Sequence, residues 1–261
     1  MKPVTPKKHL GQHFLTAPAI AQKIADNLLF DTFDKVLEIG PGTGVLTQFL
    51  IEKTKLLQLV EIDKESIHYL HERYPQLKNQ IHEGDFLKMD LRTFFQGDSF
   101  AIIGNFPYNI STQIVFKVLE NRSLIPFFTG MFQKEVAERI CEAPGTKKFG
   151  ILSVLSQIFY DTHYCFTVKP GVFNPPPKVD SGVIRLTRKD NFHCPCDEAL
   201  LFRLVKMSFQ QRRKTLRNSL KPMGLPKSLT EDSIFDQRPE KLSGDQFIAL
   251  TQMIEDGPFS D

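Results

Sequence analysis

The sequence contains no long hydrophobic run. No apolar stretch approaches the roughly 20 residues that a membrane-spanning helix needs, so a transmembrane protein is excluded. The first eight residues include three lysines, and no apolar segment follows them, so we expect no secretory signal peptide. These absences favour a cytoplasmic protein with no membrane partner.

The sequence also lacks the patterns of common metal sites. It has four cysteines but no C-x-x-C pair, and its seven histidines include no H-E-x-x-H motif. Cys194-Pro195-Cys196 has no second pair of ligands at zinc spacing. We therefore expect reduced thiols and no bound metal ion.

Acidic residues are missing from two long segments. Residues 1–25 contain four lysines and no acid, and residues 199–230 contain eight basic side chains and no acid. Since the net charge of the whole chain is only +3, the remaining residues are net acidic. Charge separated in this way favours contact with a polyanion such as a nucleic acid. The alternative is that both segments are ordinary solvated faces.

Strand and helix patterns alternate through most of the chain, which predicts an α/β fold whose parallel sheet is covered on both faces. The last two predicted strands have no helix between them, which favours an antiparallel pair at the sheet edge. The predicted strands are residues 35–39, 57–62, 80–84, 100–104, 127–133, 163–168 and 182–187, and the predicted helices are 17–29, 45–53, 64–74, 112–120, 134–142 and 150–159.

Strand patterns stop at about residue 190, and apolar residues then recur at helical spacing. A length of 261 residues with 41% hydrophobic content suffices for one large and one small domain. We predict a first domain of residues 1–188 and a small, all-helical domain of residues 189–261. In that second domain we expect Arg213 and Arg217 to share one face of a helix, flanked by Arg212 and Lys214.

A glycine-rich turn follows the first predicted strand. Gly40, Gly42 and Gly44 form a G-x-G-x-G pattern, one residue shorter than the dinucleotide fingerprint. A shorter turn suits a ligand without a pyrophosphate, and glycines let the backbone approach that ligand closely. Glu61 ends the next apolar run, where a carboxylate can accept hydrogen bonds from ribose hydroxyls.

The sequence Asn105-Phe106-Pro107-Tyr108 follows another apolar run. The Asn105 amide offers a carbonyl oxygen, Pro107 fixes the backbone and Tyr108 offers a flat ring against which a base can stack. This combination suits holding the exocyclic amine of a heterocycle. Taken alone, the four residues could form an ordinary strand-to-loop turn.

The chain resembles the rRNA adenine dimethyltransferase family from about residue 7 to residue 255, and in particular its bacterial small-subunit branch. Two departures are His13, where the family often has Asn, and Phe106, where it often has Leu. The segments that carry the resemblance are Gly11–Leu15, Glu38–Gly44, Glu61–Asp63, Gly84–Phe86, Asn105–Thr112, Gln133–Val136, Phe173–Ser181 and Gln211–Leu220.

The resemblance implies a Rossmann-like class I methyltransferase with a seven-stranded, mostly parallel sheet that uses S-adenosylmethionine (SAM) and no metal. Glu61 would bind the ribose of SAM, Asp85 its adenine amine, and Phe86 would flank that adenine. The implied cofactor-binding residues are His13, Leu15, Gly40, Gly42, Gly44, Glu61, Asp85, Phe86 and Asn105.

For catalysis, the resemblance implies that the Asn105 side chain and the Phe106 carbonyl hold an adenine N6 amine. Tyr108 would stack on the target ring, and Phe173 would cover its other face. The implied catalytic residues are Asn105, Phe106, Pro107, Tyr108 and Phe173, and the implied RNA-binding residues are Arg212, Arg213, Lys214 and Arg217.

The implied function is dimethylation of two adjacent adenines in the 3′-terminal hairpin of small-subunit (16S) rRNA. A monomer would act on the immature 30S particle, late in its biogenesis. One alternative is a resistance-type methyltransferase of large-subunit (23S) rRNA. Another is a mainly non-catalytic ribosome-assembly factor that binds RNA. The acid-free basic segment and the proline-rich loop favour the small-subunit enzyme, and the intact Glu61, Asp85, Asn105 and Tyr108 argue against a purely non-catalytic role.

Overall fold

The computed structural model describes residues 3–28, 33–190 and 193–257. They form two compact units, each assembled from two stretches of chain. The sheet unit comprises Met1–Ala137 and Thr162–Arg188, and the helical unit comprises Glu138–Asp161 and Lys189–Asp261. Residues 138–161 therefore group with the C-terminal helices, and the domain boundary after residue 188 stays a prediction.

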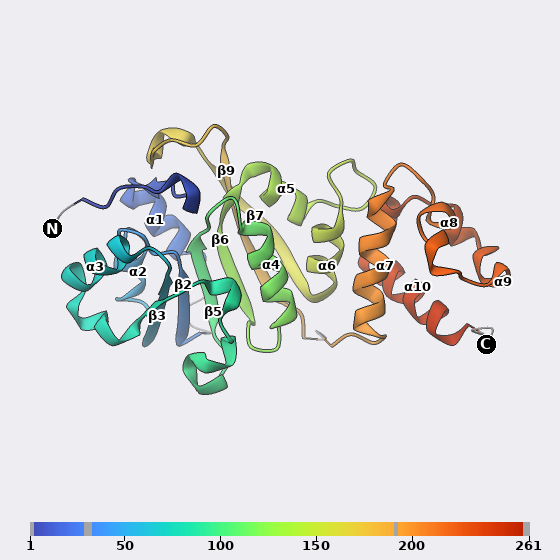
Figure 1. Cartoon of the computed structure of the whole chain (residues 1–261), viewed down its shortest axis with the longest axis horizontal. Helices are drawn as coiled ribbons and strands as arrows, with labels where there is room; N and C mark the ends of the chain where they lie inside the picture. Colours follow the sequence, from blue (N-terminus) through green and yellow to red (C-terminus); the bar gives the residue numbers. More distant parts are fainter. Residues whose placement is uncertain (1–2, 29–32, 191–192, 258–261) are drawn as a thin grey trace. The chain divides into compact units, whose positions relative to one another are not determined.

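A seven-stranded sheet forms the core of the fold (Figure 1), with strands in the order β4-β3-β2-β5-β6-β9-β7. Neighbouring strands from β4 to β6 are parallel, and β9 runs antiparallel to β6, which confirms the predicted α/β sheet. β2 and β5 are almost fully buried, as expected for a sheet covered on both faces. The strands are Lys35–Ile39 (β2), Leu56–Glu61 (β3), Ile81–Glu83 (β4), Ala101–Asn105 (β5), Phe127–Gln133 (β6), Tyr160–Val168 (β7) and Ser181–Arg188 (β9).

Helices cover both faces of this sheet. In Figure 1, α1 (Pro18–Ala25), α2 (Thr47–Leu50) and α3 (Lys64–Arg73) lie on one side and α4 (Ser111–Glu120) on the other. The α2 helix is shorter than the predicted 45–53, because residues 45–46 and 51–53 form turns at its two ends. Of the helix predicted at 17–29, Leu29 lies outside the described residues.

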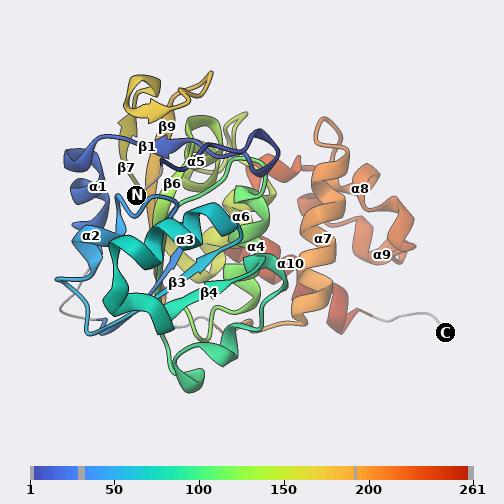
Figure 2. The same ribbon diagram turned by 60° about the vertical axis from the view of Figure 1, so that its left-hand side comes forward.

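An N-terminal arm, residues 7–16, crosses the carboxyl ends of the central strands. It contains a short 3-10 helix, Lys8–Leu10, and strand β1 (Phe14–Leu15), which pairs antiparallel with β8 (Phe173–Asn174). Figure 2 shows the arm, in dark blue, beside the yellow segment that carries β8. This pairing of two-residue strands was not predicted, since neither strand has a periodic pattern of its own.

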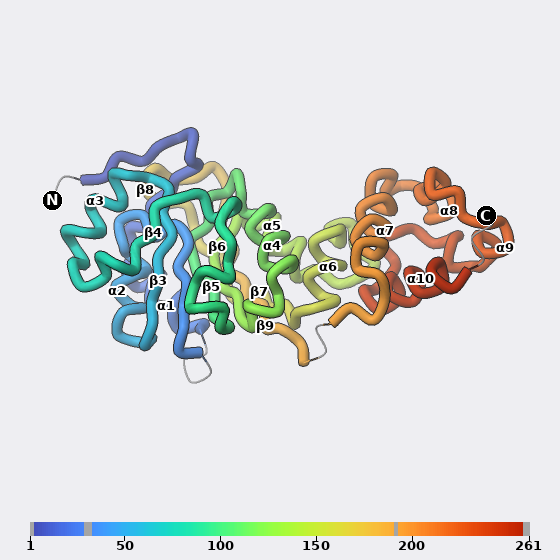
Figure 3. The backbone as a smooth tube through the Cα atoms, turned by 60° about the horizontal axis from the view of Figure 1, so that its bottom comes forward, coloured from blue at the N-terminus to red at the C-terminus, as the bar shows by residue number. Residues whose placement is uncertain are grey.

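The helical unit packs α7 (Glu198–Gln210) against α6 (Ile151–Phe159) and α10 (Gly244–Asp256), as the tube in Figure 3 traces. Ser243 starts α10 with a capping box, in which its hydroxyl accepts from the Gln246 N–H at 3.3 Å. This unit also contains α8 (Leu216–Ser219) and α9 (Lys227–Thr230), and α5 (Lys134–Cys141) spans the boundary between the two units.

The expectation that Arg213 and Arg217 share one helix is wrong. α7 ends at Gln210, and α8 begins only at Leu216. The backbone of Gln211 leaves the helical region, and Thr215 adopts an extended conformation that starts the new helix. The basic segment is therefore a turn between two helices.

Candidate active site

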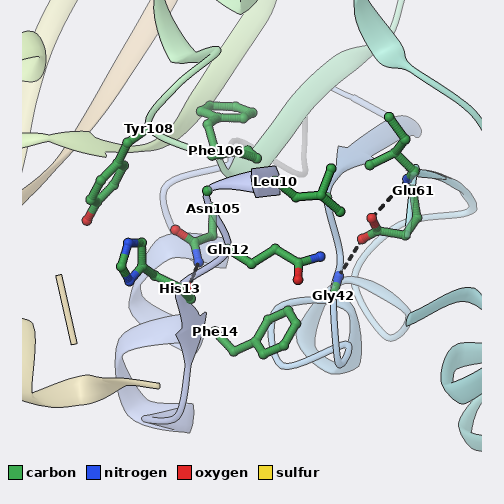
Figure 4. Close-up of a pocket in the computed structure, with 13 residues that line it drawn as sticks. Leu10, Gln12, His13, Phe14, Gly42, Glu61, Asn105, Phe106 and Tyr108 are labelled. Carbon is green, nitrogen blue, oxygen red and sulfur yellow. Dashed lines mark hydrogen bonds between the residues drawn. The ribbon is translucent and has the colours of Figure 1, made fainter. Parts of the chain in front are cut away.

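A pocket lies between the N-terminal arm and the carboxyl ends of β2, β3 and β5 (Figure 4). The ends of neighbouring parallel strands are where ligands bind in open α/β sheets. The pocket therefore brings together the glycine loop, the Asn105–Tyr108 motif and the N-terminal arm. Its lining residues are Leu10, Gly11, Gln12, His13, Phe14, Gly40, Gly42, Glu61, Ile62, Asn105, Phe106, Pro107 and Tyr108.

The glycine loop has a backbone conformation and close neighbours that leave no room for side chains. Gly40, Gly42 and Gly44 all have positive φ, at 66°, 55° and 75°. A Cβ atom on Gly42 would lie 2.8 Å from the Phe14 ring, and one on Gly44 would lie 2.4 Å from the Tyr74 ring. The loop therefore fits closely beneath the arm and offers bare backbone to the pocket.

Glu61, at the end of β3, is held by the backbone around it. Its carboxylate accepts N–H groups from Gly42 at 3.0 Å, Ile62 at 2.9 Å and Asp63 at 3.0 Å. Burial raises the pKa of Glu61, and these three hydrogen bonds oppose that rise. Because each carboxylate oxygen can accept more than one hydrogen bond, Glu61 can still accept from a ligand hydroxyl.

A second buried carboxylate, Glu38, lies in β2 just before the loop and was missed by the sequence reasoning. It is 1% exposed, and the Thr47 hydroxyl donates to it at 2.7 Å. Burial raises the pKa of Glu38 to about 8, so it holds a proton at neutral pH. Glu38, Leu15 and Asn105 line a smaller cavity that shares Phe14, Gly40 and Gly42 with the pocket. An acid flanked directly by apolar residues in a predicted strand was the signal that could have found it.

The Asn105 side chain is oriented by the arm. Its Nδ2 donates to the backbone carbonyl of His13 at 3.0 Å. The Oδ1 atom therefore points away from that carbonyl, as Figure 4 shows. No other residue in the described part of the chain donates a hydrogen bond to it, so Oδ1 is free to accept from a ligand.

Tyr108 is fixed from two sides. Its hydroxyl lies 2.6 Å from the Ser181 hydroxyl, and the His13 ring stacks on it with centroids 5.4 Å apart. His13 Nδ1 lies 2.7 Å from the Pro175 carbonyl, so Nδ1 is the donor. The His13 side chain therefore joins the arm, the tyrosine and the proline-rich loop.

Phe106 lines the pocket, but its side chain is packed in the core. Its ring is 1% exposed and stacks on Phe128 at 5.1 Å. Cβ atoms on Gly104 and Gly130 would lie 2.7 and 2.2 Å from this ring, so the two glycines make room for phenylalanine where the family often has leucine. The core therefore accommodates a phenylalanine ring at this position.

Asp63, which the sequence reasoning also missed, fastens the arm over the pocket. Its carboxylate accepts from the Lys7 ammonium and from Gln12 Nε2 at 3.1 Å. Burial works to raise the pKa of Asp63, but the hydrogen bonds from Lys7 and Gln12 outweigh it and hold the pKa below its usual value. The motif Glu61-Ile62-Asp63 contained this residue without indicating its partners.

Comparison with known proteins agrees with this geometry. The model of the family described as ribosomal RNA adenine dimethylase matches residues 4–255. The chain belongs to this family. It is 59% identical to ribosomal RNA small subunit methyltransferase A from Flavobacterium johnsoniae, covering 98% of each chain. It is 57% identical to the protein of the same name from Bacteroides thetaiotaomicron, covering 98% of this chain and 96% of the other.

A solved structure supports the same family assignment. The dimethyladenosine transferase from Plasmodium falciparum superimposes with a TM-score of 0.78 at 28% identity, covering 91% of this chain and 96% of that one. The 23S rRNA methyltransferase ErmE gives a TM-score of 0.66 at 24% identity, covering 93% of this chain and 99% of that one. The latter likeness shows the class I methyltransferase fold alone.

Five residues expected in the active site of this rRNA adenine dimethylase lie outside the lining of the pocket, namely Leu15, Gly44, Asp85, Phe86 and Phe173. Leu15 lines the smaller neighbouring cavity instead. Asp85 caps a 3-10 turn by accepting from the Leu87 N–H at 3.0 Å. Phe86 is 3% exposed, and Phe173 is 5% exposed within the apolar core beside Leu15. Their roles in binding and catalysis stay predictions.

The four predicted RNA-binding residues differ in whether they contact other residues of the chain. Arg212 donates to the carbonyls of Thr146 and Lys147, and Arg217 pairs with Asp236 at 2.7 Å. Arg213 and Lys214 are exposed, and no described carboxylate pairs with either of them. These two are the cations that remain available to a polyanion.

Across residues 3–28, 33–190 and 193–257, no helix has the length and apolarity to cross a membrane. Over the same ranges, no three His, Cys, Asp or Glu side chains cluster as metal ligands would.

Proposed function

We propose that this protein transfers methyl groups from SAM to the N6 amines of two adjacent adenines in the 3′-terminal hairpin of small-subunit rRNA. The products are N6,N6-dimethyladenosines. The observation that carries this proposal is the Asn105 amide, whose Oδ1 faces the pocket because Nδ2 is bound to His13. Small-subunit rRNA as the substrate is supported by relatives that are described as small-subunit rRNA methyltransferases and match nearly the whole chain.

The residues of the pocket fit SAM. The bare glycine loop allows close approach, Glu61 offers lone pairs to ribose hydroxyls, and Ile62 offers an apolar side chain that is 49% exposed beside the pocket. Glu38, Leu15 and Asn105 surround the neighbouring cavity, which suits the methionine end. When bound, SAM supplies a methyl group on a positively charged sulfur, so no strong base is needed.

The protein's part in the reaction is to hold and aim a weak nucleophile. The lone pair of adenine N6 is delocalised into the ring. Hydrogen bonds from the amine to Asn105 Oδ1 and the Phe106 carbonyl favour a pyramidal nitrogen whose lone pair is available. Tyr108 stacks on the adenine, which must leave its own base stack to enter, and so fixes the line of attack.

We further propose that the protein acts as a cytoplasmic monomer on the immature 30S particle, where Arg213 and Lys214 contact rRNA phosphates. Mass analysis of rRNA from cells lacking the protein tests the substrate. The small-subunit hairpin should lose both dimethyladenosines. Loss of an adenine modification from 23S rRNA instead would favour the resistance-type enzyme, and unchanged rRNA would favour a non-catalytic assembly factor.

A further inference from the structure

A larger cavity adjoins the catalytic pocket and shares His13 and Tyr108 with it. Its volume is about 600 Å³. Ligand sites in proteins commonly measure ~300 to ~1,000 Å³, so this cavity, which we name the flanking groove, has room for a nucleotide. The N-terminal arm, Gln133 and the proline-rich loop at residues 175–179 form its other walls.

The flanking groove is basic. None of the residues that line it is acidic, and two of them, Lys8 and Lys178, are exposed. In the described part of the chain no carboxylate forms an ion pair with either ammonium group. Asp180, two positions after Lys178, pairs instead with Lys169 at 2.8 Å. The two lysines are therefore available to an anion from outside the chain.

The groove also has an apolar surface. Val179 is 46% exposed, one of three large hydrophobic residues exposed to this degree among those described. Pro176 and Pro177 lie beside it in the lining, and the His13 ring adds a flat face. Cations beside a flat, apolar surface are the features that bind a single-stranded nucleotide, through its phosphate and its base.

We propose that the flanking groove binds the nucleotide next to the target adenine, with its phosphate between Lys8 and Lys178 and its base against Val179 and the prolines. This inference rests on the proposed function. Because His13 and Tyr108 line both cavities, a chain whose target base enters the catalytic pocket carries its neighbour into the groove. With two adjacent target adenines, that neighbour is the other adenine for at least one of the two transfers.

The test uses the full-length protein with Lys8→Gln and Lys178→Gln combined. The matched control combines Lys55→Gln and Lys78→Gln, which removes the same charge from exposed positions just before β3 and β4, at the amino-end edge of the sheet. Affinity for undermethylated small subunits is measured at several salt concentrations, alongside methyl transfer and SAM affinity. The groove variant should lower the log–log salt slope by about 0.7 for each lost contact to a single strand, while the control keeps the wild-type slope. SAM affinity should be the same in all three proteins.

A second measurement tests whether the groove lysines contact the phosphates beside the two adenines. The probe is a single-stranded RNA oligonucleotide with two adjacent adenines, with or without neutral methylphosphonate linkages flanking them. The neutral linkages should weaken binding to the wild type and to the control, and leave binding to the groove variant unchanged. If wild type methylates the subunits but the groove variant matches the control in both measurements, the groove proposal is overturned. If wild type methylates no small-subunit rRNA, the proposed function fails first.

Discussion

The side-chain Nδ2 of Asn105 donates to the backbone carbonyl of His13, across 92 positions of the chain. An isolated asparagine amide can present either its oxygen or its nitrogen to a ligand. Here the arm occupies the nitrogen, so the oxygen faces the pocket. The N-terminal arm is thus part of the catalytic arrangement as well as its cover.

Removing residues 1–13 should therefore slow methyl transfer by roughly 10- to 100-fold, because Asn105 is then free to turn its amide. His13→Asn should slow the reaction much less than the deletion, since it keeps the backbone hydrogen bond to Asn105 and loses only the ring contacts with Tyr108 and Pro175. Single-turnover rates at saturating SAM measure both variants. Loss of activity in His13→Asn equal to that of the deletion would show that the imidazole, and not the carbonyl, is what matters.

Glu61→Ala should weaken SAM binding by roughly 1–3 kcal/mol through loss of the ribose acceptor. It should also lower thermal stability, because the N–H groups of Gly42, Ile62 and Asp63 lose their shared partner. Calorimetry with SAM and a melting curve measure the two effects. Glu61→Gln keeps one oxygen acceptor and should be milder in both, and unchanged SAM affinity in the alanine variant would remove Glu61 from the site.

Glu38 predicts a pH dependence of stability. In the unfolded chain Glu38 loses its proton near the usual 4.5, whereas in the folded protein it keeps the proton up to about 8. Between these values the folded state binds more protons than the unfolded state, so this group's contribution lowers stability as pH rises. Glu38→Gln should flatten that fall. Urea unfolding across the window measures it, and an identical pH profile in the variant would contradict the assigned pKa.

In the basic segment, we expect Arg213 and Lys214 to contact RNA and Arg217 to stabilise the fold. Arg213→Gln with Lys214→Gln should lower the salt slope of binding to immature small subunits by about one unit per lost contact, with no change in melting temperature. Arg217→Gln serves as the matched control. It breaks the pairing with Asp236 and should cost about 1 kcal/mol of stability. If the double variant lowers the melting temperature and keeps the wild-type slope, its cations are structural.

The strands, the main helices and the two central motifs were predictable because each is local in the sequence. A buried parallel strand is a short apolar run, and a glycine loop or Asn-Phe-Pro-Tyr is read directly. The pairing of β1 with β8 could not be predicted, because Phe14 and Asn174 lie far apart in the sequence and neither strand has a periodicity of its own. Likewise, the Lys7–Asp63 contact depends on where the folded arm crosses the sheet.

The single measurement that tests the central claim is methyl transfer by the purified protein to undermethylated small subunits, compared between wild type and Asn105→Ala. Labelled SAM and mass analysis of the rRNA give the rate and the position. Wild type should yield dimethyladenosine in the 3′-terminal hairpin. Asn105→Ala should be slower by on the order of 100-fold or more, while RNA binding stays near normal. An Asn105→Ala protein that methylates adenine at the wild-type rate would contradict the role of this amide in holding the amine.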